Sequence, residues 1–243
     1  MFAYDAELLK LLKSTPDSIE EVVQTLHSID RTCVDQDGLK WFNWLYLRIT
    51  EAVANRTATP GGFNDPAWLA ELDVRFAGFY FDALKSWLSQ EPASGCWRVL
   101  FERRDDTRIA RVQFALAGVN AHINHDLCAA IVATCQATLS SPDHGGTHYK
   151  DYTALNSTLD AQVDAAKKTL MVRLLGEVLP PVSRLEDTLA AWNVTAAREK
   201  AWLNAGHLWL LRTAPSLSGA FLSTVDGFTA VIGKTLLVPV PEW

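Results

Sequence analysis

The chain has 243 residues, of which 49% are hydrophobic and 21% charged, which is ordinary for a globular protein that buries a substantial core. Its formal net charge is -6, and no local cluster of Lys and Arg offsets it. This charge opposes binding to nucleic acid or to an anionic membrane, so we expect neither as a partner. The composition leaves the oligomeric state open.

Neither end of the chain carries a recognisable targeting signal. Residues 1–14 lack the apolar core and the small-residue cleavage site of a secretory signal. The apolar region 217–240 is interrupted by Asp226, Lys234 and several glycines, so we expect a buried helix there and not a membrane span. The four cysteines show no CxxC spacing. We therefore expect a cytoplasmic protein with reduced, buried thiols.

Almost every segment has a helical pattern. Two proline signals mark helix starts, because Thr15-Pro16 and Asp65-Pro66 each place a capping residue before a proline at the first helical position. We predict helices over residues 16–30, 37–55, 65–88, 96–104, 108–139 and 148–175, short helices with capping boxes at Ser183 and Thr195, and a last apolar helix after Pro215.

No strand-period alternation and no internal repeat is visible. The pattern predicts an all-α, single-domain bundle of roughly eight to ten helices over residues 1–243, with the helix at about 108–139 buried in its centre.

The central helix carries the strongest indication of a functional site. Between Arg111 and Asp126 its only ionisable residues are His122 and His125, which is unusual for a surface helix. His122 and Asp126 lie one turn apart on one stripe, and His125 flanks that stripe. The neighbouring positions on the stripe are mainly alanine or glycine, which allow close helix packing or leave space for a ligand.

Polar residues on the apolar faces of other helices are candidates to meet these groups. Asp73 falls on the same face as Phe76 and Tyr80, where an unpaired carboxylate would cost several kcal/mol. Asn156 shares an apolar face with Tyr152 and must be hydrogen-bonded or contact a ligand.

Three hypotheses account for the central helix. In the first, His122, His125 and Asp126 form an H-x-x-H-D motif that holds a divalent metal ion such as Fe, Zn or Mn. The motif lacks the glutamate of H-E-x-x-H and the E-x-x-H pairs of di-iron bundles.

In the second hypothesis, Asp126 or Asp73 orients one imidazole as a metal-free general acid or base. The third is purely structural: His122 is a buried polar contact, Arg111 pairs with an acid and His125 is solvated. The expected catalytic residues are His122, Asp126 and Asp73, and the expected substrate-binding residues are Tyr80, Asn124, Tyr152, Asn156 and Arg111.

The segment Asn120–Leu127, N-A-H-I-N-H-D-L, resembles the signature of a largely bacterial family of unknown function, the family numbered DUF5995. Residues 63–68 with 76–77 and 80–84 are similar to a second block of that family, and Asp151-Tyr152 with Leu155-Asn156 to a third. The similarity spans about residues 37–175. It implies a helical domain in which His122, Asn124 and Asp126 belong to the motif and His125 fills a variable position. The family brings no established activity.

We therefore expect a soluble helical enzyme that acts on a small, hydrophobic organic molecule by proton transfer or metal-assisted chemistry, such as isomerisation, cyclisation or hydrolysis. The pocket would lie between the helices that bear Asp73, His122/Asp126 and Asn156. The alternative is a non-catalytic module that binds a small molecule or a partner with the same cavity.

Overall fold

The computed structural model describes residues 2–175 and 193–239, and every regular element in these ranges is a helix. The predicted all-α bundle is therefore confirmed. The helices are α1 (Asp5–Leu11), α2 (Ile19–Thr32), α3 (Gly38–Thr57), α4 (Pro66–Leu88), α5 (Gly95–Phe101), α6 (Arg111–Ala121), the π-helical turn η1 (His122–Asp126), α7 (Leu127–Ala137), α8 (Thr147–Ala154), α9 (Asn156–Leu175), α11 (Val194–Leu211) and α12 (Pro215–Leu236).

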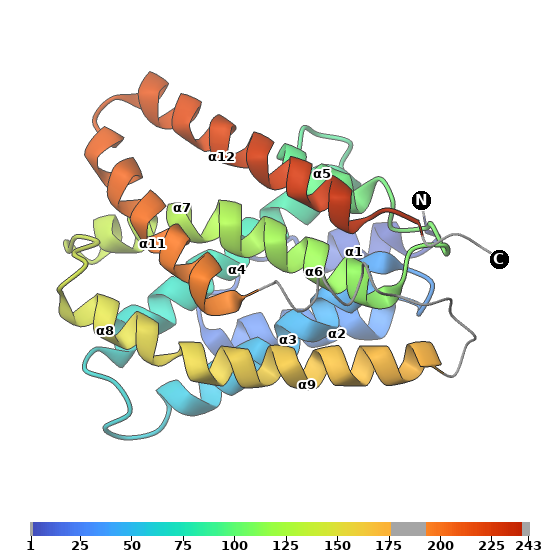
Figure 1. Ribbon diagram of the computed structural model, residues 1–243, viewed down its shortest axis with the longest axis horizontal. Coiled ribbons are helices and arrows are strands. Elements are labelled where there is room, and N and C mark those ends of the chain that lie inside the picture. The colour runs from blue at the N-terminus through green and yellow to red at the C-terminus, as the bar shows by residue number, and fades with distance from the viewer. Residues whose placement is uncertain (1, 176–192, 240–243) are drawn as a thin grey trace.

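The run α6–η1–α7 passes through the middle of the bundle, as predicted (Figure 1). Residues 112–123 are all buried, with α6 packed mainly on α3 and α7 mainly on α11. The buried side chains form one hydrophobic cluster that joins helices from α1 to α12. In the described ranges, no helix combines the length and apolar character needed to cross a bilayer.

Of the helix starts predicted from capping residues, the one at Asp65 is confirmed and those at Thr15 and Thr195 are wrong. Asp65 caps α4 as expected, since its carboxylate accepts a hydrogen bond from the Trp68 backbone N–H. The start at Thr15-Pro16 is wrong, because Ser18 caps α2 three residues later. The capping box at Thr195 is also wrong: Asn193 caps α11. The box predicted at Ser183 lies outside the described residues.

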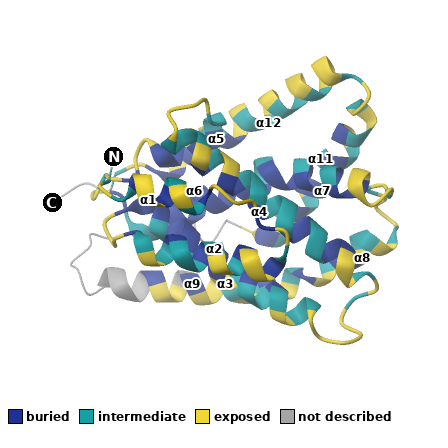
Figure 2. Ribbon diagram, turned by 180° about the vertical axis from the view of Figure 1, so that it is seen from behind, coloured by how far each residue is buried: buried dark blue, intermediate teal, exposed yellow. Residues whose placement is uncertain are grey.

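Two other helix predictions differ from the structure. The helix predicted at 148–175 is divided at Leu155 into α8 and α9. The last helix was expected to be buried, but α12 is largely exposed along its length (Figure 2). It buries only Thr229, Gly233 and Leu236, while the apolar side chains that it leaves exposed include Phe228.

The predicted central helix is present as one run from Arg111 to Ala137, but its hydrogen bonding changes in the middle. At its middle the Leu127 N–H donates to the His122 carbonyl, five residues back, which makes residues 122–126 a π-helical turn. Such turns are rare in proteins, and those that occur often lie at functional sites. The turn falls on the H-x-x-H-D residues themselves.

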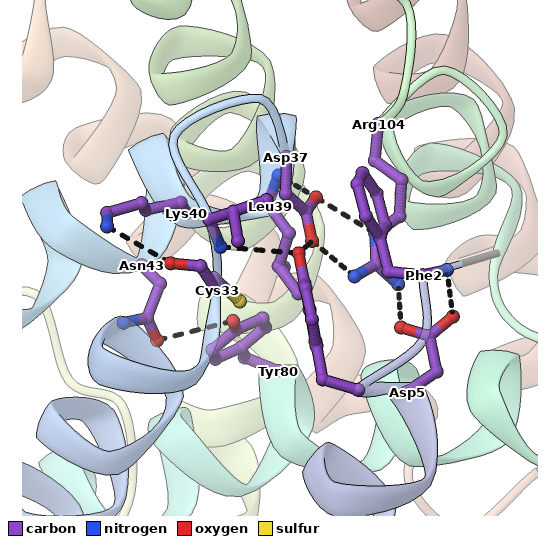
Figure 3. Close-up of polar contacts among 11 residues, drawn as sticks. Phe2, Asp5, Cys33, Asp37, Leu39, Lys40, Asn43, Tyr80 and Arg104 are labelled. Carbon is purple, nitrogen blue, oxygen red and sulfur yellow. Dashed lines mark hydrogen bonds and ion pairs between the residues drawn. The ribbon is translucent and has the colours of Figure 1, made fainter.

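A buried ion-pair cluster ties the N-terminus to the core (Figure 3). The Arg104 guanidinium pairs with the fully buried Asp37 carboxylate and lies 3.0 Å from Asp5 Oδ1. Tyr4 also donates a hydrogen bond to Asp37, over 2.8 Å. Charges that are buried this deeply require such partners, so the cluster accounts for its own polar residues and needs no ligand.

Candidate functional site

The centre of the candidate site is a buried histidine held by a carboxylate. His122 Nδ1 lies 2.9 Å from Asp126 Oδ2, and both side chains are 2% exposed. The predicted pairing across one turn is therefore present. Because an ionised carboxylate only accepts hydrogen bonds, we assign the imidazole proton to Nδ1, which leaves Nε2 as an acceptor.

Asp126 accepts hydrogen bonds on both of its oxygens. Trp97 Nε1 donates to Oδ2 over 2.9 Å, and His125 Nδ1 lies 2.7 Å from Oδ1. Burial alone would raise the pKa of Asp126, but the hydrogen bonds from His122 and His125 outweigh it and lower that pKa below the usual value. Asp126 is thus a fixed, ionised acceptor between two imidazoles.

Aromatic rings enclose the imidazole of His122. The Phe76 ring stacks on it with centroids 3.5 Å apart, and the Tyr46 ring meets it edge-on at 4.7 Å. Burial lowers the pKa of His122, and the hydrogen bond with Asp126 opposes this only in part. The ring is therefore neutral near pH 7, with a basic nitrogen at Nε2.

Nε2 of His122 is buried and has no hydrogen-bond partner among the residues that the structure describes. Since more than nine in ten buried polar groups are paired, an unpaired nitrogen at this position requires an explanation. The explanation is supplied by a neighbouring cavity.

His122 lines a partly open cavity between α3, α4, α6–α7, α9 and α11, whose free volume is about 60 Å³. Its described walls are mostly aliphatic and aromatic. They are Phe42, Tyr46, Ile49, Val53, Leu69, Leu72, Asp73, Phe76, Val119, His122, Ile123, Leu127, Leu155, Leu159, Val163, Val194 and Arg198. A mainly apolar hollow with a few converging polar groups is the usual form of a small-molecule site.

Asp73 is one of these polar groups, as the sequence predicted. It is 9% exposed, its Oδ2 atom has no hydrogen-bond partner in the described part of the chain, and it lines the same cavity as His122. Burial raises the pKa of Asp73 from 3.8 to about 7. Near neutral pH a large part of this group is thus an uncharged carboxylic acid that can donate a hydrogen bond.

The Tyr46 hydroxyl is also buried; within residues 2–175 and 193–239 it has no hydrogen bond of good geometry, and its polar neighbours include Thr50. Burial raises its pKa well above the usual value, and the Asp73 charge adds to the rise, so the hydroxyl keeps its proton. Tyr46 and Asp73 therefore bring two potential proton donors to the cavity that contains the acceptor nitrogen of His122.

Arg198 adds a positive charge to the cavity wall. It is 6% exposed and forms no ion pair within the described part of the chain. Instead, Nε donates to Asn156 Oδ1 and Nη2 donates to the Tyr152 carbonyl, each over 2.8 Å. Burial lowers the pKa of Arg198, and the guanidinium lies over the Tyr152 ring, 3.8 Å from its centroid.

A family profile described as "Family of unknown function (DUF5995)" matches residues 19–239. The chain belongs to this family. The match confirms the resemblance noted in the sequence and extends it beyond residues 37–175 at both ends. Neither a search of curated proteins nor a search of solved structures found a match.

In this DUF5995 protein, three predicted substrate-binding residues lie in the second layer around the cavity. Tyr152 and Asn156 hold Arg198 in place, and the Tyr152 hydroxyl donates to the Arg198 carbonyl. Tyr80 is fully buried and directs its hydroxyl at Asn43 Oδ1, 3.4 Å away (Figure 3). None of the three is among the residues that line the cavity.

The other two predicted substrate-binding residues are directed elsewhere. Asn124 donates to Asn120 Oδ1 over 3.0 Å, on the side that faces α12. Arg111 lies over the Trp41 ring and pairs with Asp35, as in the structural hypothesis. Neither lines the cavity.

The predicted metal ligands His122, His125 and Asp126 are adjacent, but their geometry is not that of a common ligand set. Each histidine directs Nδ1 at a different oxygen of Asp126. Within the described residues, the one group of three metal-ligating side chains whose donor atoms lie within 4.8 Å of one another is Cys96, His125 and Asp226.

Tyr46, Trp97 and Arg198 also belong to the site but were not predicted from the sequence. A usable signal existed for Arg198, because Val194, Arg198, Ala201, Trp202 and Ala205 repeat at helical spacing and place one charge on an apolar face. No comparable signal marks Tyr46 or Trp97, since each lies in a segment with aromatic residues on several sides.

Proposed function

We propose that this DUF5995 protein is an enzyme that binds a small, mainly apolar organic molecule in the cavity and moves a proton within it. The observation that carries the proposal is the buried, unpartnered Nε2 of His122, whose opposite ring nitrogen is fixed by Asp126. A carboxylate that holds one nitrogen of an imidazole leaves the other as an oriented general base.

The remaining polar groups of the cavity suggest what the molecule carries. Arg198 has a buried guanidinium without an ion-pair partner in the described ranges, so a carboxylate or another anionic group on the ligand would compensate it. Tyr46 and protonated Asp73 are donors suited to a carbonyl oxygen on which negative charge develops.

Together these roles favour isomerisation of a carbonyl compound. His122 Nε2 takes a proton from a carbon next to the carbonyl, and Tyr46 or Asp73 stabilises the resulting enolate oxygen. His122 then returns the proton to a different carbon of the same molecule. The substrate and the product have the same composition, so the step consumes no co-reactant.

We also propose a reducing, cytoplasmic setting. All four cysteines are free and buried, which agrees with the expectation from their spacing.

The test uses the full chain incubated with an extract of cellular small molecules in D₂O. Retained compounds are identified by mass spectrometry, and their carbon-bound hydrogens are followed for exchange with deuterium. We expect the wild type to retain an anionic carbonyl compound and to catalyse exchange, and we expect His122→Gln to retain it without exchange.

Tyr46→Phe and Tyr80→Phe form a matched pair, because both remove a buried hydroxyl but only Tyr46 lines the cavity. We expect only Tyr46→Phe to slow exchange. Retention without exchange by the wild type would favour the non-catalytic binding module, and no retained compound at all would argue against a ligand site in the cavity.

A further inference from the structure

A second cluster of reactive side chains adjoins the buried Asp126 through His125. Cys96 at the start of α5, His125 in η1 and Asp226 in α12 each offer one donor atom, and these atoms lie within 4.8 Å of one another. We propose that Cys96, His125 and Asp226 bind a divalent metal ion of the zinc type, with solvent or a ligand at the fourth position.

The donor types and spacing suit this ion. Zinc takes thiolate sulfur, imidazole nitrogen and carboxylate oxygen at about 2.0–2.3 Å in tetrahedral sites, so its donor atoms lie about 3.3–3.8 Å apart. Donors already within 4.8 Å of one another need to move by about 1 Å to reach that geometry. Binding releases the thiol proton of Cys96 to solvent, which leaves a metal-bound thiolate.

The hydrogen bond between His125 and Asp126 agrees with the assignment. His125 Nδ1 lies 2.7 Å from Asp126 Oδ1, and no hydrogen bond to its Nε2 is found in the described ranges. A histidine that ligates a metal through one nitrogen almost always directs the other at a carboxylate, a carbonyl or water. Asp126 is such a carboxylate, and its hydrogen bonds to Trp97 and His122 hold it in place.

Asp226 is also held in a suitable position. Its two oxygens accept hydrogen bonds from the backbone N–H groups of Gly95 and Cys96, each over 2.8 Å. A carboxylate has about four lone-pair positions, so two remain for a metal. Gly95 permits this approach, since a Cβ atom there would lie 2.9 Å from Asp226 Oδ2.

The site is reachable from solvent. Cys96 is buried, whereas the His125 side chain is 16% exposed and Asp226 is only partly buried. A metal ion can therefore enter from the His125 and Asp226 side without passing through the cavity lined by His122, and the inference does not depend on the proposed function.

The test is metal binding by the full chain after chelator treatment, measured by titration calorimetry with Zn²⁺ and by absorption with Co²⁺. We expect one ion per chain and a thiolate-to-cobalt charge-transfer band in the near ultraviolet. Cys96→Ala should abolish the band. His125→Gln should weaken metal binding at least about tenfold, because even the loss of a residue that only hydrogen-bonds a metal ligand lowers metal affinity by that factor or more.

Cys33→Ala and His27→Gln are matched controls, because Cys33 is equally buried outside the cluster and His27 pairs with Glu51 elsewhere. If Cys96→Ala does not fold, as judged by circular dichroism, His125→Gln decides. Absence of Zn²⁺ and Co²⁺ binding by the wild type, or binding that Cys96→Ala and His125→Gln leave unchanged, would overturn the proposal. No substrate enters these measurements, so their outcome is separate from that of the proposed function.

Discussion

Replacing Asp73 with asparagine should change how the stability of the protein depends on pH. In the folded state burial raises the pKa of Asp73 from 3.8 to about 7, a difference of about three pH units. One unit corresponds to about 1.36 kcal/mol, so the full effect is about 4 kcal/mol. Because the folded state holds this proton more tightly than the unfolded state, the free energy of unfolding falls between about pH 4 and pH 7 and then levels off.

The assay is urea unfolding of the wild type, Asp73→Asn and Asp82→Asn at a series of pH values across that range. Asp82 is the matched control, because it is an exposed aspartate of the same helix. We expect Asp73→Asn to lose the fall between about pH 4 and pH 7 and to be more stable than the wild type above it. Equal slopes for Asp73→Asn and the wild type would show that Asp73 is not a buried, destabilised carboxylate and would remove it as a proton donor.

Two pairs of substitutions test the close packing of α6 on α3 and the buried ion pairs of Arg104. Gly118→Ala should destabilise the protein by about 1–3 kcal/mol in urea unfolding, because the new Cβ would lie 2.3 Å from Phe42 Cγ where α6 meets α3. Gly206→Ala is the control: its Cβ would meet nothing within 4 Å, so it should raise the free energy of unfolding by about 0.5–1 kcal/mol. Arg104→Met should cost about 3–5 kcal/mol, since it leaves buried carboxylates unpaired. The same change at the exposed Arg108 should cost under about 1 kcal/mol, and similar losses at both arginines would contradict this account.

The sequence predicted the parts of the site that depend on local spacing. His122 and Asp126 were paired because residues four apart share a helix face, and that relation survives in the π-helical turn. Asp73 was predicted to lie near them because a carboxylate on an apolar face needs a polar partner, and it lines the same cavity. The start of α4 followed from the capping chemistry of Asp65.

The parts that depend on three-dimensional packing could not be read from spacing. The π-helical turn rests on one shifted backbone hydrogen bond, and a helical pattern in the sequence is compatible with either bonding scheme. Tyr152 and Asn156 were expected to touch a substrate, but the arginine that they hold belongs to a helix about forty residues later in the chain. The sequence thus predicted the residues that hold Arg198 and not Arg198 itself, which lines the cavity.

Asp126 connects two histidines that have different surroundings. It offers one oxygen to each imidazole; His122 lines the cavity, and His125 belongs to the cluster with Cys96 and Asp226. An ionised carboxylate can accept from both sides at once, whereas an amide in its place would present a donor to one of them. The proton positions on both rings therefore depend on the buried charge of Asp126. This charge couples the proposed catalytic base, His122, to the proposed metal ligand, His125, although the substrate and the metal ion would bind at separate places.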